Sequence, residues 1–210
     1  HLAHRRQRQM CIRDRDLTKF TNKEFDENKT SNELRVSAKY KISNKLTLEI
    51  ESESGKKTDD IGFLQKKDGE ILFGRRDINS VENSLDLNFN IDNYKYLSLR
   101  FRNFWSTANY DNVLFSLKND GMRELTDHSK LDFDPNTNFN LWNLDLNFDW
   151  WFSPGSTITL QYKNQIFNRD NESGLKYYKS LKNLFEFPVE HQLSLRINYL
   201  IDFNKLRRND

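Results

Sequence analysis

The chain has 210 residues, with 33 Lys and Arg against 31 Asp and Glu, a formal net charge of +2 and a mean hydropathy of −0.89. No stretch approaches the roughly 18 consecutive apolar residues of a transmembrane helix, which excludes a helical membrane span. The single cysteine excludes an internal disulfide framework and a cysteine-based zinc site. Three alanines against 25 asparagines favour strands and turns over helices.

The basic excess lies in residues 1–15, which hold five arginines, the only cysteine and two of the four histidines. Without this segment, 28 basic residues stand against 30 acidic ones, a net charge of −2. It has no apolar core and so is not a secretory signal. We interpret it as a non-native leader that resembles translated adapter sequence at the ends of metagenomic reading frames. The alternative is a basic arm for nucleic acid or an anionic membrane.

For the rest of the chain we predict three parts, and no nucleic-acid partner. Residues 16–32 are expected to be a linker or a partial strand, 33–205 a β-segment and 206–210 a polar tail. Apolar and polar residues alternate throughout 33–205, as in strands with one apolar and one polar face. The longest ladders, 142–152 and 193–203, each place six apolar residues at every second position. Shorter ladders occupy 34–42, 46–50, 85–91, 97–101 and 158–162.

Short and long connections alternate between these ladders. The short ones are rich in turn-forming residues and fall at 43–44, 92–93 and 153–156. The long, polar ones cover 54–82, 106–138 and 168–190, and the first can hold an extra hairpin in which 61–64 pairs with 71–73. No crossover helix is indicated. The pattern predicts an all-β fold, an antiparallel up-and-down meander of about 7–9 strands.

Strand length and loop alternation favour a membrane barrel. Each long ladder covers 11 residues, and a tilted strand needs about 9–11 to cross the hydrocarbon. Short turns at one end and long loops at the other are typical of outer-membrane barrels in Gram-negative bacteria. We therefore predict a part of such a barrel, with outer-membrane lipid as its partner. The sheet would have unpaired edges, so we expect a C-terminal fragment of a longer barrel. A soluble β-sheet with a solvated outer face is the alternative.

The barrel interpretation assigns roles to two sets of side chains. Aromatic residues near strand ends would form a membrane girdle, and charged residues on the alternate face would line a lumen, either as a selective pore or as a salt-bridged plug. The predicted girdle residues are Trp105, Trp142, Trp150, Trp151, Phe152, Tyr199 and Phe203. The predicted lumen-facing residues are Arg100, Arg102, Asp145, Asp149, Lys163, Arg196 and Asp202.

Several short motifs carry a family resemblance. They are FGRRD at 73–77, VEN at 81–83, LSLRFRNFWS at 97–106, FDWWFSPGS and ITL within 148–160, and LSLRINYLIDF at 193–203. Over about residues 70–205 the chain resembles an uncharacterised family in which a family-9-like carbohydrate-binding module precedes a C-terminal outer-membrane β-barrel. The resemblance implies an outer-membrane anchor or passage linked to glycan binding or uptake. It transfers no catalytic or glycan-binding residue.

Other candidate sites are weak. Asp127-His128-Ser129 contains triad residue types, but neighbours on an extended chain point to opposite sides. His128 acting with distant residues would make a barrel enzyme, and His191 fits an interfacial position. Asp132, Asp134, Asn136 and Asn138 resemble a calcium loop only superficially, because Thr137 replaces the required glycine and Asn143 the glutamate.

We therefore predict no enzyme activity, no catalytic or metal site, and no cofactor. The remaining candidate partner is an oligo- or polysaccharide. Asn-rich and aromatic loops at 106–112 and 168–178 could hold sugar by stacking and amide hydrogen bonds, although asparagine and tyrosine are also ordinary in turns and girdles. A soluble extracellular carbohydrate-binding module is thus the second hypothesis for function.

Overall fold

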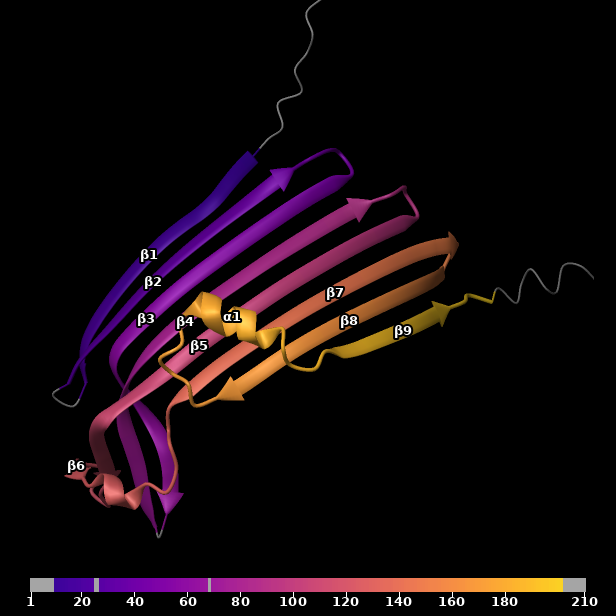
Figure 1. The fold of residues 1–210 in the computed structure, drawn as a ribbon. Helices are drawn as coiled ribbons and strands as arrows, with labels where there is room; N and C mark the ends of the chain where they lie inside the picture. Colours follow the sequence, from indigo (N-terminus) through magenta and orange to yellow (C-terminus); the bar gives the residue numbers. More distant parts are fainter. Residues whose placement is uncertain (1–9, 25–26, 68, 202–210) are drawn as a thin grey trace, which may run out of the picture.

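The chain folds as a single antiparallel sheet (Figure 1). The computed structural model describes residues 10–24, 27–67 and 69–201. The strands are β1 (Met10–Glu24), β2 (Glu27–Lys41), β3 (Leu46–Lys67), β4 (Glu70–Asn90), β5 (Lys95–Leu117), β6 (Arg123–Thr126), β7 (Thr137–Ser153), β8 (Ser156–Asp170) and β9 (Glu190–Asn198). A short 3-10 helix, η1 (His128–Lys130), follows β6, and one α-helix, α1 (Tyr177–Leu184), precedes β9.

The strand order confirms the predicted all-β meander. Strands pair in the order β1-β2-β3-β4-β5-β7-β8-β9, and β6 pairs with β5 beside this path. Each long strand is hydrogen-bonded to its neighbour in sequence, except that the short β6 intervenes between β5 and β7. Over the described residues the sheet is open, with β1 and β9 at its two edges, and it is not closed into a barrel.

The predicted short connections are confirmed as tight turns. In the β2–β3 turn the Ser43 hydroxyl accepts hydrogen bonds from the backbone N–H groups of Lys45 and Leu46, both at 3.1 Å. In the β4–β5 turn the Asp92 carboxylate accepts from the N–H of Tyr94 at 2.8 Å. Gly155, in the β7–β8 turn, has a φ of 73°, a conformation that favours glycine.

The prediction of a loop over 54–82 is wrong, whereas the hairpin suspected within it is confirmed. β3 and β4 continue through this segment, and Phe63 lies opposite Phe73 in their pairing. β5 likewise continues to Leu117, well into the connection predicted at 106–138. In 54–60, 76–84 and 106–112 both faces of these strands are largely polar, so these stretches lack the apolar alternation that reveals a strand in sequence.

The N-terminal part of the described chain is also strand. β1 pairs with β2 from Met10 opposite Tyr40 to Glu24 opposite Glu27. The segments predicted as leader and as linker or partial strand thus overlap β1 and β2, and residues 1–9 lie outside the described residues. The interpretation of residues 1–15 as foreign sequence stays a prediction.

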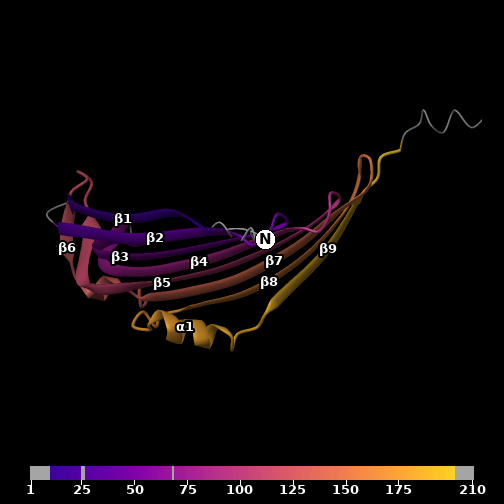
Figure 2. The same ribbon diagram turned by 90° about the horizontal axis from the view of Figure 1, so that it is seen from above.

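The sheet is a single layer for most of its area. Figure 2 shows the strands bowed, with α1 lying on their convex side. Buried apolar side chains gather in two places. Leu72 and Leu114, 1% exposed, lie where β4 and β5 extend toward β6, and Ile166 of β8 and Leu184 of α1 lie where the helix meets the sheet. None of the described helices is long and apolar enough to cross a bilayer.

Candidate functional site

One face of the sheet carries a continuous apolar belt. Residues directly opposite each other in antiparallel strands share a face, so the pairing shows how the ladders line up. The central row, from β2 to β9, is Tyr40, Leu48, Leu87, Leu99, Leu146, Tyr162 and Leu193. The flanking rows add Ala38, Ile50, Leu85, Phe101 and Leu144 on the loop side, and Leu46, Phe89, Leu97, Phe148, Leu160 and Leu195 on the turn side. These three rows are the apolar belt.

The apolar belt has little protein over it. Ile50 is 46% exposed, Leu160 40% and Leu195 62%, values far from those of a packed core. Among the residues that the structure describes, another segment covers it only at its loop-side margin, where Trp142 packs against Phe185, with ring centroids 5.0 Å apart. An apolar surface this wide is unusual for a protein face that meets only water.

The opposite face carries a row of charges at the same level. Its members, from β2 to β8, are Lys39, Glu49, Asp86, Arg100, Asp145 and Lys163, and on β9 the neutral Gln192 ends the row. Lys39 pairs with Glu49 at 2.9 Å, Arg100 with Asp86 at 2.5 Å, and both Arg102 and Lys163 approach Asp145, at 3.8 and 4.0 Å. The charges are therefore largely paired across strands.

The structure brings the predicted lumen-facing residues onto this charged face. Arg100, Arg102, Asp145 and Lys163 form the ion pairs just described. Arg196 lies opposite Thr159, whose hydroxyl donates to Asp149 at 2.6 Å. Asp202 lies outside the described residues. That this face lines a lumen stays a prediction.

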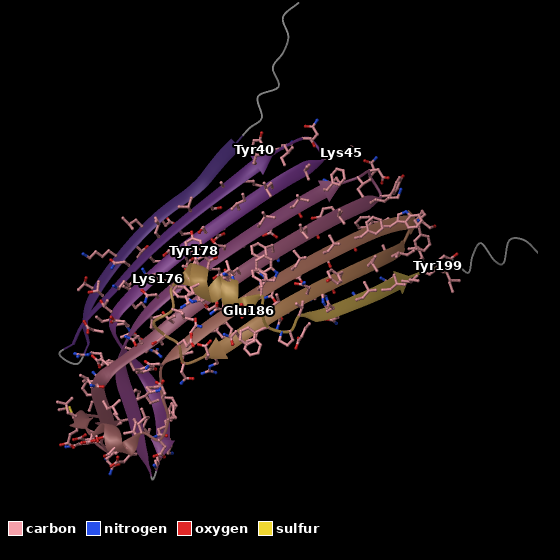
Figure 3. The ribbon with its side chains drawn as sticks, viewed as in Figure 1. Tyr40, Lys45, Lys176, Tyr178, Glu186 and Tyr199 are labelled. Atoms are coloured by element: carbon pink, nitrogen blue, oxygen red, sulfur yellow. The ribbon has the colours of Figure 1, made fainter. Side chains whose placement is uncertain are left out.

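The predicted girdle residues separate into groups. At the turn end, Phe152 lies between Trp150 and Tyr199, with ring centroids 5.9 and 6.2 Å apart, respectively. Figure 3 shows Tyr199 at the same end of the sheet as Tyr40 and Lys45. At the loop end, Trp142 packs against Phe101, with ring centroids 4.2 Å apart and the rings tilted by 51°.

Three girdle residues depart from this arrangement. Trp105 is only 6% exposed because it lies beneath Tyr177. Trp151 belongs to the charged face, by its pairing with Thr157, and is 46% exposed. Phe203 lies outside the described residues.

A buried asparagine network joins α1 to the sheet on the belt side. Asn138 accepts from the Trp105 indole at 3.0 Å and from Ser180 at 3.1 Å, and donates to Asp170 at 3.1 Å. Asn140, like Asn138, is 0% exposed, and it donates to Ser180 at 3.1 Å. Buried amides with this many partners hold α1 in one position.

The sequence analysis did not predict α1, although Leu181, Leu184 and Phe185 follow Tyr177 at helical spacing.

Tyr177 extends this network toward β4. Its hydroxyl donates to Asn103 at 2.8 Å and accepts from Asn83 at 3.0 Å. Burial against the sheet raises the pKa of Tyr177 above its ordinary value, against the lowering effect of the Asn83 hydrogen bond. The phenol is therefore neutral at physiological pH and able to act as a donor.

A second polar cluster lies where β3 and β4 extend beyond the belt. Asp60 is 6% exposed and receives hydrogen-bonded ion pairs from Lys29 at 2.5 Å and Arg76 at 2.9 Å. Arg76 also donates to the Tyr110 hydroxyl at 2.8 Å. Burial raises the pKa of Asp60, but the hydrogen bonds from Lys29 and Arg76 together outweigh it and hold that pKa below its ordinary value. The cluster clamps four strands together, β2, β3, β4 and β5.

This cluster predicts acid sensitivity. The pKa of Asp60 is lower in the folded chain than in the unfolded one, so its stabilisation is complete above pH about 5 and is lost as the pH falls through the lowered folded pKa. Unfolding by urea in detergent, followed from pH 7 to pH 2, should show a loss of stability in acid that is smaller in the Asp60→Asn variant. An acid response identical in Asp60→Asn and the parent chain would contradict this assignment.

The weaker sequence candidates have ordinary structural contacts where the structure describes their side chains. In the described part of the chain no group of His, Cys, Asp and Glu is placed to hold a metal. Asp134 and Asn136 cap backbone N–H groups at 2.9 and 2.8 Å, and Asn138 belongs to the buried network. Asp127 similarly accepts from the N–H of Ser129 at 2.7 Å, while the side chain of His128 lies outside what the structure describes. His191 Nδ1 lies 2.8 Å from the Tyr162 hydroxyl, at the end of the belt.

The two loops predicted to contact sugar come together at one groove. Ser173 donates to Asn109 at 3.0 Å, which links 168–178 to 106–112. Between residues 173–177 and the extended strands β3, β4 and β5 lies a groove of about 620 Å³, which we call the loop-end groove. It is lined by residues 54–56, 77, 79–81, 105, 107, 109 and 173–177.

Comparison with known proteins gives a family. No curated protein matches the chain. A family model described as a domain of unknown function, DUF5916, matches residues 7–209 and thus nearly the whole chain. The match covers both ladders, the two-faced sheet and α1. The chain therefore belongs to the DUF5916 family.

Proposed function

We propose that this chain forms part of the wall of an outer-membrane β-barrel in a Gram-negative bacterium, with the apolar belt against lipid and the charged face toward the lumen. The observation that carries the proposal is the segregation of the two faces: at one level of the sheet, one side is apolar and exposed and the other is charged and paired. The convex side of the bowed sheet, on which α1 lies, is the belt side, as the outside of a barrel requires (Figure 2).

The apolar ladder of β7 fits the height of a membrane. On this strand the apolar side chains of the belt face extend beyond the three rows of the belt, from Trp142 to Phe152, which are ten residues apart. At about 3.4 Å per residue and a tilt of about 40°, this separation spans about 26 Å of height, close to the roughly 25 Å apolar band of outer-membrane barrels. Lys95, whose Nζ lies 5.8 Å from the centre of the Trp150 ring, would extend its amine toward the interface.

The opposite orientation is costly. Turning the charged face to lipid would expose Arg100, Asp145 and Lys163, and each cation at the midplane costs about 2–4 kcal/mol. A sheet edge in lipid also costs energy, so β1 and β9 must pair with further strands, supplied by the rest of a longer chain or by another copy. We propose an anchor or a passage linked to glycan binding or uptake, with no catalysis assigned to it.

Lipid-dependent quenching of tryptophan tests the placement. A variant that keeps only Trp150 (W105F, W142F, W151F) should lose most of its fluorescence when refolded into vesicles of brominated phosphatidylcholine, because Trp150 lies at the belt. The matched control keeps only Trp105 (W142F, W150F, W151F), which lies under α1 and should be quenched much less. Membrane fractionation and a gel shift between heated and unheated samples complete the test. Recovery as a soluble monomer with neither tryptophan quenched would refute the barrel.

A soluble extracellular carbohydrate-binding module is the second candidate. The loop-end groove favours it, because the groove does not depend on lipid and brings together hydroxyl, amide and aromatic groups. The same quenching experiment separates the two candidates, since a soluble module would leave Trp150 in water.

A further inference from the structure

We propose that the loop-end groove is a binding site for an acidic oligosaccharide. Its floor comes from β3, β4 and β5 on the belt side of the sheet, and its wall from the segment that leads into α1. Figure 3 shows Lys176 at the start of this helix, in front of the middle strands. The site differs in place from the lumen, because it opens on the same face as the apolar belt.

A buried hydroxyl in the groove points to a ligand. Thr107 is 1% exposed, and its Oγ1 has no hydrogen-bond partner among the residues the structure describes. Leaving a buried hydroxyl unpaired is unfavourable, so such a group is expected to pair with something that enters from outside. Thr107 lines the groove, and the sugar hydroxyls of a glycan supply both donors and acceptors.

The neighbours of Thr107 suit the same ligand. On the floor, Thr107 lies opposite Asn79, which in turn lies opposite Lys56. Amide side chains offer a donor and an acceptor together, as vicinal hydroxyls require. Tyr177 on the wall presents an aromatic ring beside them. This combination of a few polar groups with an aromatic side chain is typical of a small-molecule site.

The charges of the groove favour an acidic glycan. Lys56 and Lys176 line it, against the single carboxylate of Asp77. Asp77 already accepts a hydrogen bond from the backbone N–H of Asp59 at 3.2 Å. Both lysines are exposed and can move to meet a carboxylate or phosphate on a sugar.

If the proposed membrane placement holds, the groove has a specific surrounding. It lies beyond the loop-side margin of the apolar belt, at the level of lipid headgroups, on the outside of the wall. The sugar would then be the headgroup of a membrane glycolipid and not cargo in the lumen. This last step rests on the proposed function, whereas binding of an acidic oligosaccharide does not.

Calorimetry on the detergent-solubilised chain tests the site, with hexagalacturonate as probe and galactohexaose as its neutral counterpart. We expect hexagalacturonate to bind at least about tenfold more tightly, and Thr107→Val to weaken that binding about tenfold, as the loss of one hydrogen bond predicts. Thr107→Ser, which keeps the hydroxyl, should retain binding. Thr47→Val, on the charged face, is the matched control and should change nothing. Replacing both Lys56 and Lys176 by Gln should remove the preference for the acidic probe.

The outcomes separate the two proposals. The proposed site is overturned if neither probe binds at millimolar concentration. It is also overturned if Thr107→Val binds hexagalacturonate as tightly as the parent chain does. Equal affinity for both probes overturns the acidic ligand. Unchanged far-UV circular dichroism of each variant shows that the comparison is between folded chains. If hexagalacturonate binds but Trp150 is not quenched in brominated vesicles, the binding site in the groove stands and the membrane placement is overturned.

Discussion

Replacing Leu146 by arginine should prevent or strongly weaken insertion of the sheet into a bilayer. Leu146 lies in the central row of the apolar belt, between Leu99 and Tyr162. An arginine on the lipid face at the midplane costs about 2–4 kcal/mol, a large share of the stability of an ordinary domain. The fraction of chain that enters vesicles, measured by flotation and by protease protection, should fall accordingly.

The neighbouring residue supplies the control. Asn147 lies opposite Ser98 and Gln161, so its side chain belongs to the charged face. Asn147→Arg adds the same charge one residue away and should insert almost as well as the parent chain. Equal insertion of Leu146→Arg and Asn147→Arg would mean that the belt does not face lipid, as would be the case for a soluble sheet with both faces in water.

Replacing Asn138 by leucine should destabilise the chain by about 3 kcal/mol and release α1 from the sheet. The substitution leaves the buried Trp105 indole without its acceptor and removes one of the three groups that donate to the Asp170 carboxylate. Each buried polar group left unpaired costs about 1–3 kcal/mol. Urea unfolding in detergent gives the free energy, and tryptic cleavage after Lys176 or Lys182 reports whether α1 has left its place.

The control for this substitution is Asn143→Leu. Asn143 lies opposite Arg102 and Gln165 on the charged face, outside the network. A surface substitution of this kind changes stability by no more than about 0.5 kcal/mol. Comparable destabilisation by Asn143→Leu, or trypsin resistance of α1 in Asn138→Leu, would show that the network does not fix the helix.

Much of the sheet follows from the sequence because one face of each strand is apolar. The ladders at 142–152 and 193–203, and the tight turns between neighbouring ladders, identify both the strands and their antiparallel order. The pairing of 61–64 with 71–73 could also be predicted, since each of these segments is a short apolar cluster, with Phe63 in one and Phe73 in the other. Because successive side chains of a strand point to opposite faces, Arg100 and Asp145 then lie on the face opposite to that of their neighbours Leu99 and Leu146.

The rest could not be foreseen for physical reasons. In 54–60 and 76–84 both faces of the strand are mainly polar, so the sequence resembles a loop although the backbone ladder continues. α1 is a helix of 8 residues, too short to be stable by itself, and its position depends on Asn138 and Asn140 from a distant strand. The loop-end groove requires two segments about 65 residues apart in sequence, as the bond between Ser173 and Asn109 shows. Nothing in the pattern of polar residues in either segment indicates that the two segments lie side by side in the fold.

The sequential pairing of strands has an evolutionary consequence. Because β4 and β5 form a hairpin whose outer edges meet β3 and β7 in the same alternating register, duplicating that hairpin would insert two strands without changing the face of any other residue. Loss of a hairpin would be tolerated for the same reason. Sheets of this kind can therefore vary in width by steps of two strands, while the apolar and charged rows remain aligned.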